Sequence, residues 1–508
     1  MLFYTGSALG KSVSRPSCNL QCSGINMNRL DKPNAGYGLI LLMAFIFLAG
    51  CAAVGPDYHP PDKSVSSEWQ TPLKGGLADE PVDQTNLSRW WRHLDDPLLS
   101  KLIDQAVAGN LDLKEARARV REARARRGIA EAGLFPYLNA SGELMRIKGS
   151  RETGAGTERN LHATGFDAGW EVDIFGGVRR SVEATDAELQ ASQASLRDVL
   201  ITLTAEVALN YVEMRTYQAR LTTAAENLKE QEAMHNLIRQ RFEAALSDAL
   251  SLEQSRYNVE NTRSQIPSFR SGLEASQNRL AVLLGKEPGQ LRGELTPFAP
   301  IPVTPLRVAV GIPANCIRRR PDVSRAEREL AARTARIGVA TAELYPKFSL
   351  LGSIGLEALD IGGLASSDGL TYSIGPRFSW RLFHGGAIRQ NIQVQTALQE
   401  QALIRYESTI LGALEEVENA LRAYAEEQNR RKALKAASQA AQNAVSLAEE
   451  KYRAGLIGFY DVLDAQRSLR SFEDQLALSE GSVTANLISL YKALGGGWEE
   501  MSEEDRGG

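Results

Sequence analysis

The chain contains two copies of one pattern, related by a shift of about 210 residues. In each copy a helical stretch ends at a Leu-aromatic-Pro motif, residues 134–136 and 344–346, before two short alternating segments and a very long helix. Trp170 lies opposite Trp380 under the same shift. A period this long, present only twice, indicates a duplication that yields two similar halves, and not a solenoid of many short units.

The N-terminal region predicts export from the cytoplasm. Basic residues Arg29 and Lys32 precede an apolar run, 39–48, and the motif Leu-Ala-Gly-Cys follows at 48–51. This order is typical of a signal peptide, and ten apolar residues are too few to cross about 30 Å of hydrocarbon. The motif resembles the bacterial lipobox, which implies that Cys51 begins the mature chain and carries lipid. A buried or membrane-anchoring helix is the alternative.

The rest of the composition limits the function classes. Residues 1–50 are expected to be an upstream extension and signal peptide, and Ala52 after the cysteine resembles an outer-membrane address in lipoprotein sorting. Only Cys316 then remains as a free thiol, so no intrachain disulfide is expected in the mature protein. The formal net charge of -4 gives no basic excess for binding nucleic acid.

Long helices are predicted in both copies. Proline-free runs rich in Ala, Glu, Gln and Leu extend from the glycine pairs at 176–177 and 385–386 to about residues 245 and 454. About 68 residues at 1.5 Å each would reach about 100 Å. Apolar residues recur every seven positions in these runs, which predicts coiled-coil packing. The repeating positions are Leu200, Val207, Met214, Leu221 and Leu228, and Leu403, Ile410, Val417 and Tyr424.

Shorter helices and a linker complete the organisation. Helices are predicted over 97–133, 249–284 and 459–494, and two short helices would stack end to end beside one long helix. The expected domains are a lipidated segment 51–96, a first repeat 97–290, a proline-rich linker 291–320, a second repeat 321–498 and a flexible tail 499–508.

Four segments alternate between apolar and polar residues, as strands with two different faces do. They are 138–146, 164–173, 348–356 and 372–382. Strands of about ten residues can cross a membrane at a tilt. An open sheet edge is not tolerated in lipid, so four strands require further chains to close a barrel, and three chains would supply twelve. An ordinary soluble hairpin on a core is the alternative.

The order of motifs resembles the TolC-type outer membrane factors, in the lipoprotein branch that serves resistance-nodulation-division efflux pumps. The resemblance covers about residues 51–498, and its motifs include Trp-Trp-Arg at 90–92, Arg-Arg-Pro-Asp-Val at 319–323 and Leu-Gly-Gly-Gly-Trp at 494–498. It implies a mainly α protein with a membrane β-barrel part. Three chains would form a twelve-strand outer-membrane barrel that continues into a twelve-helix periplasmic barrel, with two structural repeats per chain.

The resemblance also implies partners and sites. A periplasmic adaptor protein would contact the helix-turn tips, which are Ala244, Ala245 and Leu246 in the first copy and Ala454, Gly455 and Leu456 in the second. Ala245 departs from the expected glycine. Residues that only cap the helices are the alternative. The position of the family's periplasmic gate corresponds to Tyr460, Asp464 and Arg467, whose spacing puts them on one helical stripe. An ordinary solvated helix face is the alternative there.

The predicted function is that of a passive outer-membrane exit duct in a tripartite efflux system, which forms a homotrimer in outer-membrane lipid and works with an inner-membrane pump and an adaptor. We find no catalytic set, phosphate loop or metal-ligand spacing, and expect no enzyme activity, cofactor or metal. Two alternatives remain, a channel for secretion and a lipid-anchored coiled-coil structural or adhesion protein. Because Ala245 and Leu250 stand where Gly455 and Tyr460 stand in the second copy, the second tip is expected to carry the lock.

Overall fold

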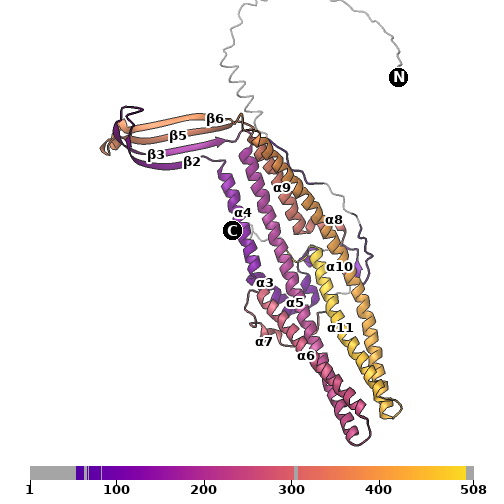
Figure 1. Cartoon of the computed structure of the whole chain (residues 1–508). Coiled ribbons are helices and arrows are strands. Elements are labelled where there is room, and N and C mark those ends of the chain that lie inside the picture. Colours follow the sequence, from indigo (N-terminus) through magenta and orange to yellow (C-terminus); the bar gives the residue numbers. More distant parts are fainter. Residues whose placement is uncertain (1–52, 62–65, 67, 82, 303–306, 499–508) are drawn as a thin grey trace, which may run out of the picture. The chain divides into compact units, whose positions relative to one another are not determined.

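Two helices of 67 residues each extend along the protein, α5 (Gly177–Glu243) and α10 (Ala387–Arg453) (Figure 1). The structure is a computed structural model that describes residues 53–61, 66, 68–81, 83–302 and 307–498. Each long helix turns back into a helix of 35 residues, α6 (Ala249–Leu283) or α11 (Phe459–Ala493). These four helices confirm the predicted pairs, and the two copies agree in length.

The predicted helix 97–133 is wrong as a single element. Two helices occupy this range, α3 (Pro97–Gly109) and α4 (Leu111–Ala132), and Asn110 between them has an extended ψ of 135°. The Asn110 side chain accepts a hydrogen bond from the Leu113 N–H and so caps α4. Its amide nitrogen also donates to the carbonyl oxygen of Leu283 at 2.9 Å, which joins the start of α4 to the end of α6.

The second copy has the same joint, made with a different side chain. Helix α8 (Pro313–Arg319) lies in the predicted linker and is followed by α9 (Pro321–Ala342), which begins at the predicted proline. Between them Arg320 donates to the carbonyl oxygen of Ala493 at 2.7 Å, at the end of α11. A shift of 210 residues relates Arg320 and Ala493 to Asn110 and Leu283. Helices α4 and α6 therefore stack end to end beside α5, as predicted, and α9 and α11 do the same beside α10. The residue before α4 or α9 joins the two helices of each stack.

The helices form four neighbouring rows. Helices α4 and α6 pack on one side of α5, α9 and α11 pack on its other side, and α10 packs beside α9 and α11. Many of the heptad positions, including Val207, Met214, Ile410, Val417 and Tyr424, are buried between these rows. One outer flank is therefore the row of α4 and α6, and the other is α10.

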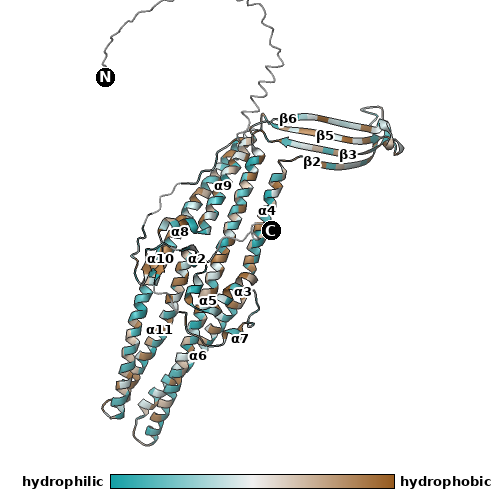
Figure 2. Ribbon diagram, turned by 180° about the vertical axis from the view of Figure 1, so that it is seen from behind, coloured by the Kyte–Doolittle hydropathy of each residue, from teal (hydrophilic) through white to brown (hydrophobic). Residues whose placement is uncertain are grey.

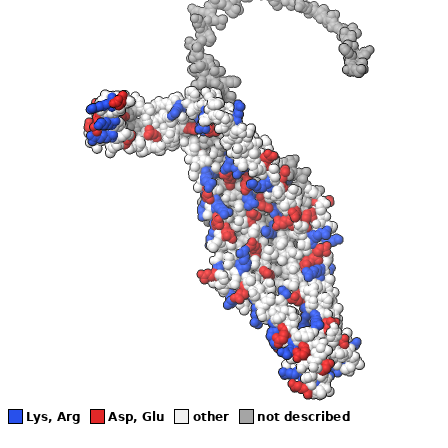
Figure 3. Space-filling view, viewed as in Figure 1, with Lys and Arg blue, Asp and Glu red and all other residues white. Residues whose placement is uncertain are grey.

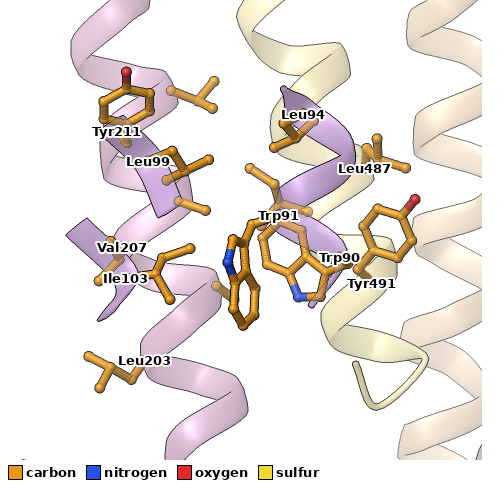
Figure 4. Packing of buried hydrophobic residues seen from close by; sticks show 14 of the residues in the cluster. Trp90, Trp91, Leu94, Leu99, Ile103, Leu203, Val207, Tyr211, Leu487 and Tyr491 are labelled. Carbon is orange, nitrogen blue, oxygen red and sulfur yellow. The ribbon is translucent and has the colours of Figure 1, made fainter. Parts of the chain in front are cut away.

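The core lies near the middle of the helical region. Trp90 and Trp91 belong to a short helix, η1 (Trp90–Leu94), and point between α5 and α11 (Figure 4). The Trp90 ring is fully buried and stacks on Tyr491 with ring centroids 5.5 Å apart. Short elements surround this cluster: α2 (Gln84–Ser88), α7 (Arg292–Leu295), and the parallel pair β1 (Leu77–Ala78) and β4 (Val308–Ala309). Cys316 is buried beside this cluster, and burial raises its pKa to about 12.

Four antiparallel strands form one sheet in the order β2 (Tyr137–Lys148), β3 (Glu158–Val172), β5 (Lys347–Ala358) and β6 (Leu370–Ser379). The predicted hairpins are confirmed, and β3 pairs with β5 to join the two copies. The bounds differ, because β3 begins at Glu158 instead of 164 and β6 ends at Ser379 instead of 382. Pairing with a neighbouring strand determines where each strand begins and ends, and the alternation of apolar and polar residues alone does not indicate this pairing.

Candidate functional site

The turn at the end of each long helix has the same hydrogen bonds. In the first, the Ala245 N–H donates to Phe242 and the Leu246 N–H donates to Arg241, at 3.0 and 2.8 Å. The second turn repeats this pattern, with the Gly455 N–H bound to Tyr452 and the Leu456 N–H to Lys451 at 3.0 and 2.9 Å. Both are therefore Schellman turns, and each leaves an exposed leucine at its outer end.

The central residue of both turns lies in the left-handed region. Gly455 has φ +74°, and a Cβ added there would meet no atom of the chain within 4 Å. Ala245 has φ +57°, although an alanine in this region costs about 1–2 kcal/mol. Alanine at position 245, where the second copy has glycine, therefore keeps the same turn geometry but adds backbone strain to the first tip.

An apolar cluster joins the two hairpins just above the tips. Ile238 of α5 packs against Phe459, Val462 and Leu463 of α11, and all four are buried. The guanidinium of Arg241 also lies over the ring of Tyr452, 5.1 Å from its centroid. The two tips of one chain are therefore held together as a unit.

The opposite face of α11 exposes Tyr460, Asp464 and Arg467. The Tyr460 side chain is 60% exposed, while Val462 and Leu463 on the other face are buried. This arrangement agrees with the helical stripe expected from their spacing. Within the described residues the Tyr460 and Asp464 side chains form no hydrogen bond or ion pair, and both are exposed.

Arg467 connects this stripe to helix α6. Its guanidinium lies over the ring of Tyr257, 5.0 Å from the centroid, and its Nε donates to Asn258 Oδ1 at 3.4 Å. Tyr257 is the residue that a shift of 210 places opposite Arg467. Equivalent positions of the two copies therefore face each other where α6 and α11 come together.

A polar groove continues from this contact between α5, α6 and α11, with a volume of about 810 Å³. Arg220 forms an ion pair with Asp474 at 2.7 Å and lies over the ring of Phe269. Burial, followed by the nearby charge of Arg467, lowers the pKa of Arg470 to about 10. Burial also raises the pKa of Glu473, which accepts a hydrogen bond from Asn227. Charged side chains therefore line the space between the hairpins.

The sheet has one apolar and one polar face. The strand register places large apolar side chains side by side on the first face: Leu138, Leu144, Phe166, Trp170, Phe348, Leu350, Ile354, Tyr372, Ile374 and Phe378. Most of them are exposed, and hydrophobic residues recur along each strand (Figure 2). The polar face carries small or charged residues such as Ser141, Asp167, Ser353 and Arg377. Charged side chains are sparse along the visible middle of the sheet and gather at its hairpin end (Figure 3).

The edges of the sheet are open within the described chain, because β2 and β6 each pair on one side only. Trp170 and Trp380 mark the end of the sheet nearest the helices, and their indole N–H groups donate to Leu134 and Leu344 at 2.9 and 3.0 Å. Aromatic residues at one level of an apolar strand face are typical of a membrane interface. Two tryptophans therefore lie at one level, at the helix-side end of the sheet.

Two features are absent from the described part of the chain. None of its helices combines the length and the apolar composition needed to cross a membrane. Among the described residues, no group of three or more His, Cys, Asp and Glu side chains could hold a metal ion.

Comparison with known proteins gives the family. The profile of the family described as "Outer membrane efflux protein" matches residues 102–286 and 312–496. The chain belongs to this family. The two matched segments differ by 210 residues at both ends, so the same family model matches each copy of the duplication.

Individual relatives agree with this assignment over nearly the whole length of the outer membrane efflux protein. Nodulation protein T of Rhizobium leguminosarum bv. trifolii is 31% identical over 90% of this chain and 97% of its own length. The probable efflux pump outer membrane protein TtgC of Pseudomonas putida is 31% identical over 91% of this chain and 96% of its own. The solved structure of the outer-membrane channel OprN has a TM-score of 0.82, with 34% identity, and the match covers 88% of this chain and 99% of that one.

The structure places most predicted site residues of this efflux protein on two surfaces. The six tip residues form two neighbouring turns, and Tyr460, Asp464 and Arg467 lie on the adjacent stripe of α11. Cys51 lies outside the described residues. Sequence reasoning missed Tyr257 and Asn258, the partners of Arg467, although the 210-residue shift pointed to Tyr257.

Proposed function

We propose that this outer membrane efflux protein is the passive exit duct of a tripartite efflux complex, as a trimer that spans the outer membrane and extends into the periplasm. The exposed apolar face of the four-stranded sheet is the observation that carries the proposal. Unpaired strand edges in lipid cost several kcal/mol for each backbone group, so both edges need a strand from another copy. Three copies would supply twelve strands, an even number within the range of known barrels.

The dimensions support this arrangement. A strand of 12 residues, the length of β2 and β5, is about 40 Å long and at a 45° tilt rises about 28 Å, close to the thickness of a hydrocarbon core. Along the helices, the flanks formed by α10 and by α4 expose large apolar residues, including Ile404 and Leu411 on α10 and Ile129 on α4. Contact between these flanks of neighbouring copies would cover such residues and close a tube of twelve helical rows.

The tips would bind a periplasmic adaptor, and an inner-membrane pump would supply the energy. Leu246 and Leu456 support this assignment, because they project from two rigid Schellman turns and are about 70% exposed, at 69% and 73%. The relative TtgC is described as a probable efflux pump outer membrane protein, which agrees with a pump partner for the present chain. The duct itself would carry out no catalysis.

The stripe of Tyr460, Asp464 and Arg467 would form the periplasmic gate. A threefold axis along the tube would bring three copies of Asp464 near one another, and the contact of Arg467 with Tyr257 would hold the second hairpin against the first. Like charges at short range favour a bound cation or proton uptake. Opening of the gate would then require the stripes of the three copies to move apart.

Conductance in planar lipid bilayers tests the duct and its gate. Purified wild-type trimers are expected to form pores, and Asp464→Ala is expected to raise the single-channel conductance at least about twofold by removing a ring of charge at the constriction. Glu480→Ala is the matched control, since it removes an exposed carboxylate from the same helix about four turns away. A protein without pores contradicts the duct. If both substitutions change the single-channel conductance equally, the assignment of the gate is contradicted while the duct is not.

Lipidation of Cys51 would anchor the N-terminus in the same membrane. Mass spectrometry of the N-terminal peptide checks it directly, because acylation adds the mass of the fatty acid chains to a peptide that begins at Cys51.

A further inference from the structure

A basic groove lies over α9, near the end of this helix that is closest to the sheet, between α5 and α10. Its volume is about 840 Å³. The described residues that line it include three arginines, Arg333 and Arg336 of α9 and Arg381 after β6, and a single carboxylate, that of Glu343. His384 and uncharged side chains of α5 and α10 complete the walls. The basic groove, defined by these residues, is separate from both tips and from the stripe of α11.

The charges of the basic groove are not balanced. Arg381 forms an ion pair with Glu343 at 2.8 Å, and Arg336 pairs with a carboxylate of α5. Lys347 also approaches Glu343 at 2.8 Å, so this carboxylate is shared by two cations. Arg333 is half-buried and forms no hydrogen bond or ion pair with any described residue. Because a cation withdrawn from water without a counter-charge is costly, the groove favours an added anion.

An uncharged group in the wall of the groove also lacks a partner. The Oε1 atom of Gln395, on α10, is buried and has no hydrogen-bond partner among the described residues. Rotation of this side-chain amide by 180° would place its NH₂ group at the same point, where it would act as a donor. An anion in the basic groove would accept that hydrogen bond, so one ligand would supply a partner to both Arg333 and Gln395.

The alternation of the sheet places the basic groove on its polar side. Arg377 and Ser379 lie on the polar face of β6. Arg381 continues this alternation two residues beyond Ser379, and its guanidinium donates to Glu343 at the end of α9. Because the apolar face is the one that would meet lipid, the polar face and the basic groove would both face the interior of a closed barrel.

The opposite face of α9 is covered by the N-terminal segment, residues 53–58. A Cβ on Gly55 would lie 2.4 Å from the Cα of Gly338 of α9. Arg180 of α5, whose side chain is only 6% exposed, forms an ion pair with Asp57 at 2.6 Å. Arg333 precedes Gly338 by five residues, which turns it about 140° around the helix axis. The N-terminal segment therefore leaves the basic groove open.

The first copy does not carry these charges. Under the 210-residue shift, the positions equivalent to Arg333 and Arg381 are Ala123 and Glu171. The first copy nevertheless forms the corresponding helix and strand, α4 and β3. Packing of the helices against the sheet therefore does not require arginine at either position, and the basic groove is a feature of the second copy.

We propose that the basic groove binds anionic small molecules in transit through the duct, namely compounds that carry two or more phosphate or carboxylate groups. The proposal rests on the proposed exit duct. A guanidinium binds carboxylate and phosphate with two parallel hydrogen bonds, and rings of arginine favour anions in pores. A trimer would carry three grooves around one axis, at the level where the helices join the sheet. A lipid headgroup has the same phosphate chemistry, but the polar side of the sheet favours a molecule inside the duct.

Calorimetric titration of inorganic tripolyphosphate into the detergent-solubilised full-length protein tests the binding site. Arg333→Gln removes the charge without breaking a contact of the described chain, and we expect at least about tenfold weaker binding, the loss typical of one charge-assisted contact. Arg325→Gln is the matched control, because Arg325 lies about two turns away on the same helix and pairs with Asp198 at 3.6 Å outside the groove. A wild type that does not bind, or equal affinities of the two variants, would overturn the proposal.

Single-pore currents in planar bilayers separate this proposal from the duct itself. Tripolyphosphate should block the wild-type current, and Arg333→Gln should raise the concentration for half block at least about tenfold, while Arg333→Lys, which keeps the charge, should stay within about threefold of the wild type. Equal block of the wild type and Arg333→Gln would overturn the groove. A protein that binds tripolyphosphate through Arg333 but forms no pores would contradict the duct alone. Displacement of tripolyphosphate by phosphatidylglycerol in nanodiscs would assign the groove to a lipid headgroup and overturn its assignment to molecules in transit.

Discussion

Replacement of Gly455 by alanine isolates the backbone strain of one tip. Gly455 adopts φ +74° in the second Schellman turn, and a Cβ there meets no other atom of the chain. The substitution therefore adds no clash, and only the left-handed conformation opposes it. Ala245 already adopts φ +57° at the equivalent position, so the reverse substitution, Ala245→Gly, is available in the same molecule.

The expected magnitude follows from two opposing terms. A left-handed conformation costs a non-glycine residue about 1–2 kcal/mol. Alanine in place of glycine recovers about 0.4–1 kcal/mol, because the opened chain loses less conformational entropy when it orders. Gly455→Ala should thus favour local opening of the second tip by about 0.5–1 kcal/mol, and Ala245→Gly should stabilise the first tip by a similar amount.

Hydrogen exchange at the tips measures these changes. The amides of residues 455 and 456 are bound to Tyr452 and Lys451, and Gly455→Ala should speed their exchange about twofold to fivefold. In Ala245→Gly, the amides of residues 245 and 246 should exchange more slowly by a similar factor. Gly412→Ala is the control, because it places the same substitution in the open interior of α10 and should stabilise that helix by about 1 kcal/mol. Slower exchange in Gly455→Ala would refute the reasoning.

Two further predictions concern the helical core. Trp90→Ala should destabilise the protein by about 3–5 kcal/mol in thermal unfolding followed by circular dichroism, since the fully buried ring stacks on Tyr491. The control Phe298→Ala, at an exposed site, should cost under about 1 kcal/mol. Equal losses of stability in the two variants would contradict the assignment of Trp90 to the core. Burial raises the pKa of Glu473 above its ordinary value of 4.5, so its ionisation disfavours the folded state as the pH rises through that range. Glu473→Gln should therefore raise the unfolding temperature near pH 7, and this gain should shrink below about pH 4.5; a gain independent of pH would contradict it.

The two copies use one architecture with different contacts. The joint between stacked helices is made by an asparagine in the first copy and by an arginine in the second, at positions related by the 210-residue shift. Arg320 is also paired with Asp322 and Glu416, at 2.8 and 2.7 Å, which Asn110 cannot reproduce. Duplicated positions can therefore keep a backbone arrangement while their side chains acquire separate tasks.

The contact between α6 and α11 shows the same separation. Arg467 and Tyr257 occupy equivalent positions, yet one is a cation and the other is the ring that it contacts. Two arginines at these positions would repel each other, and the cation–π contact would not form. The difference between the copies is thus what allows the two hairpins of one chain to bind each other at this level.

Several elements of the protein follow from the sequence alone. The lengths of the long and returning helices, the position of both tips and the alternation of the strands depend on local periodicity and on glycine and proline, which act within a few residues. The duplication then relates each element to its counterpart. For these reasons the helices at 177–243 and 387–453 and both hairpins agree closely with prediction.

Only the tertiary structure decided the contacts between distant segments. The break at Asn110 depends on a carbonyl that lies 173 residues further along the chain, and the burial of Arg180 depends on a segment 123–127 residues before it. Neither arrangement leaves a local sequence pattern. A capping side chain and a buried arginine can be identified only from the residues that they contact in space, and not from their neighbours in the sequence. Periodicity therefore determined the pieces and their lengths, while long-range hydrogen bonds and close glycine contacts determined how those pieces join.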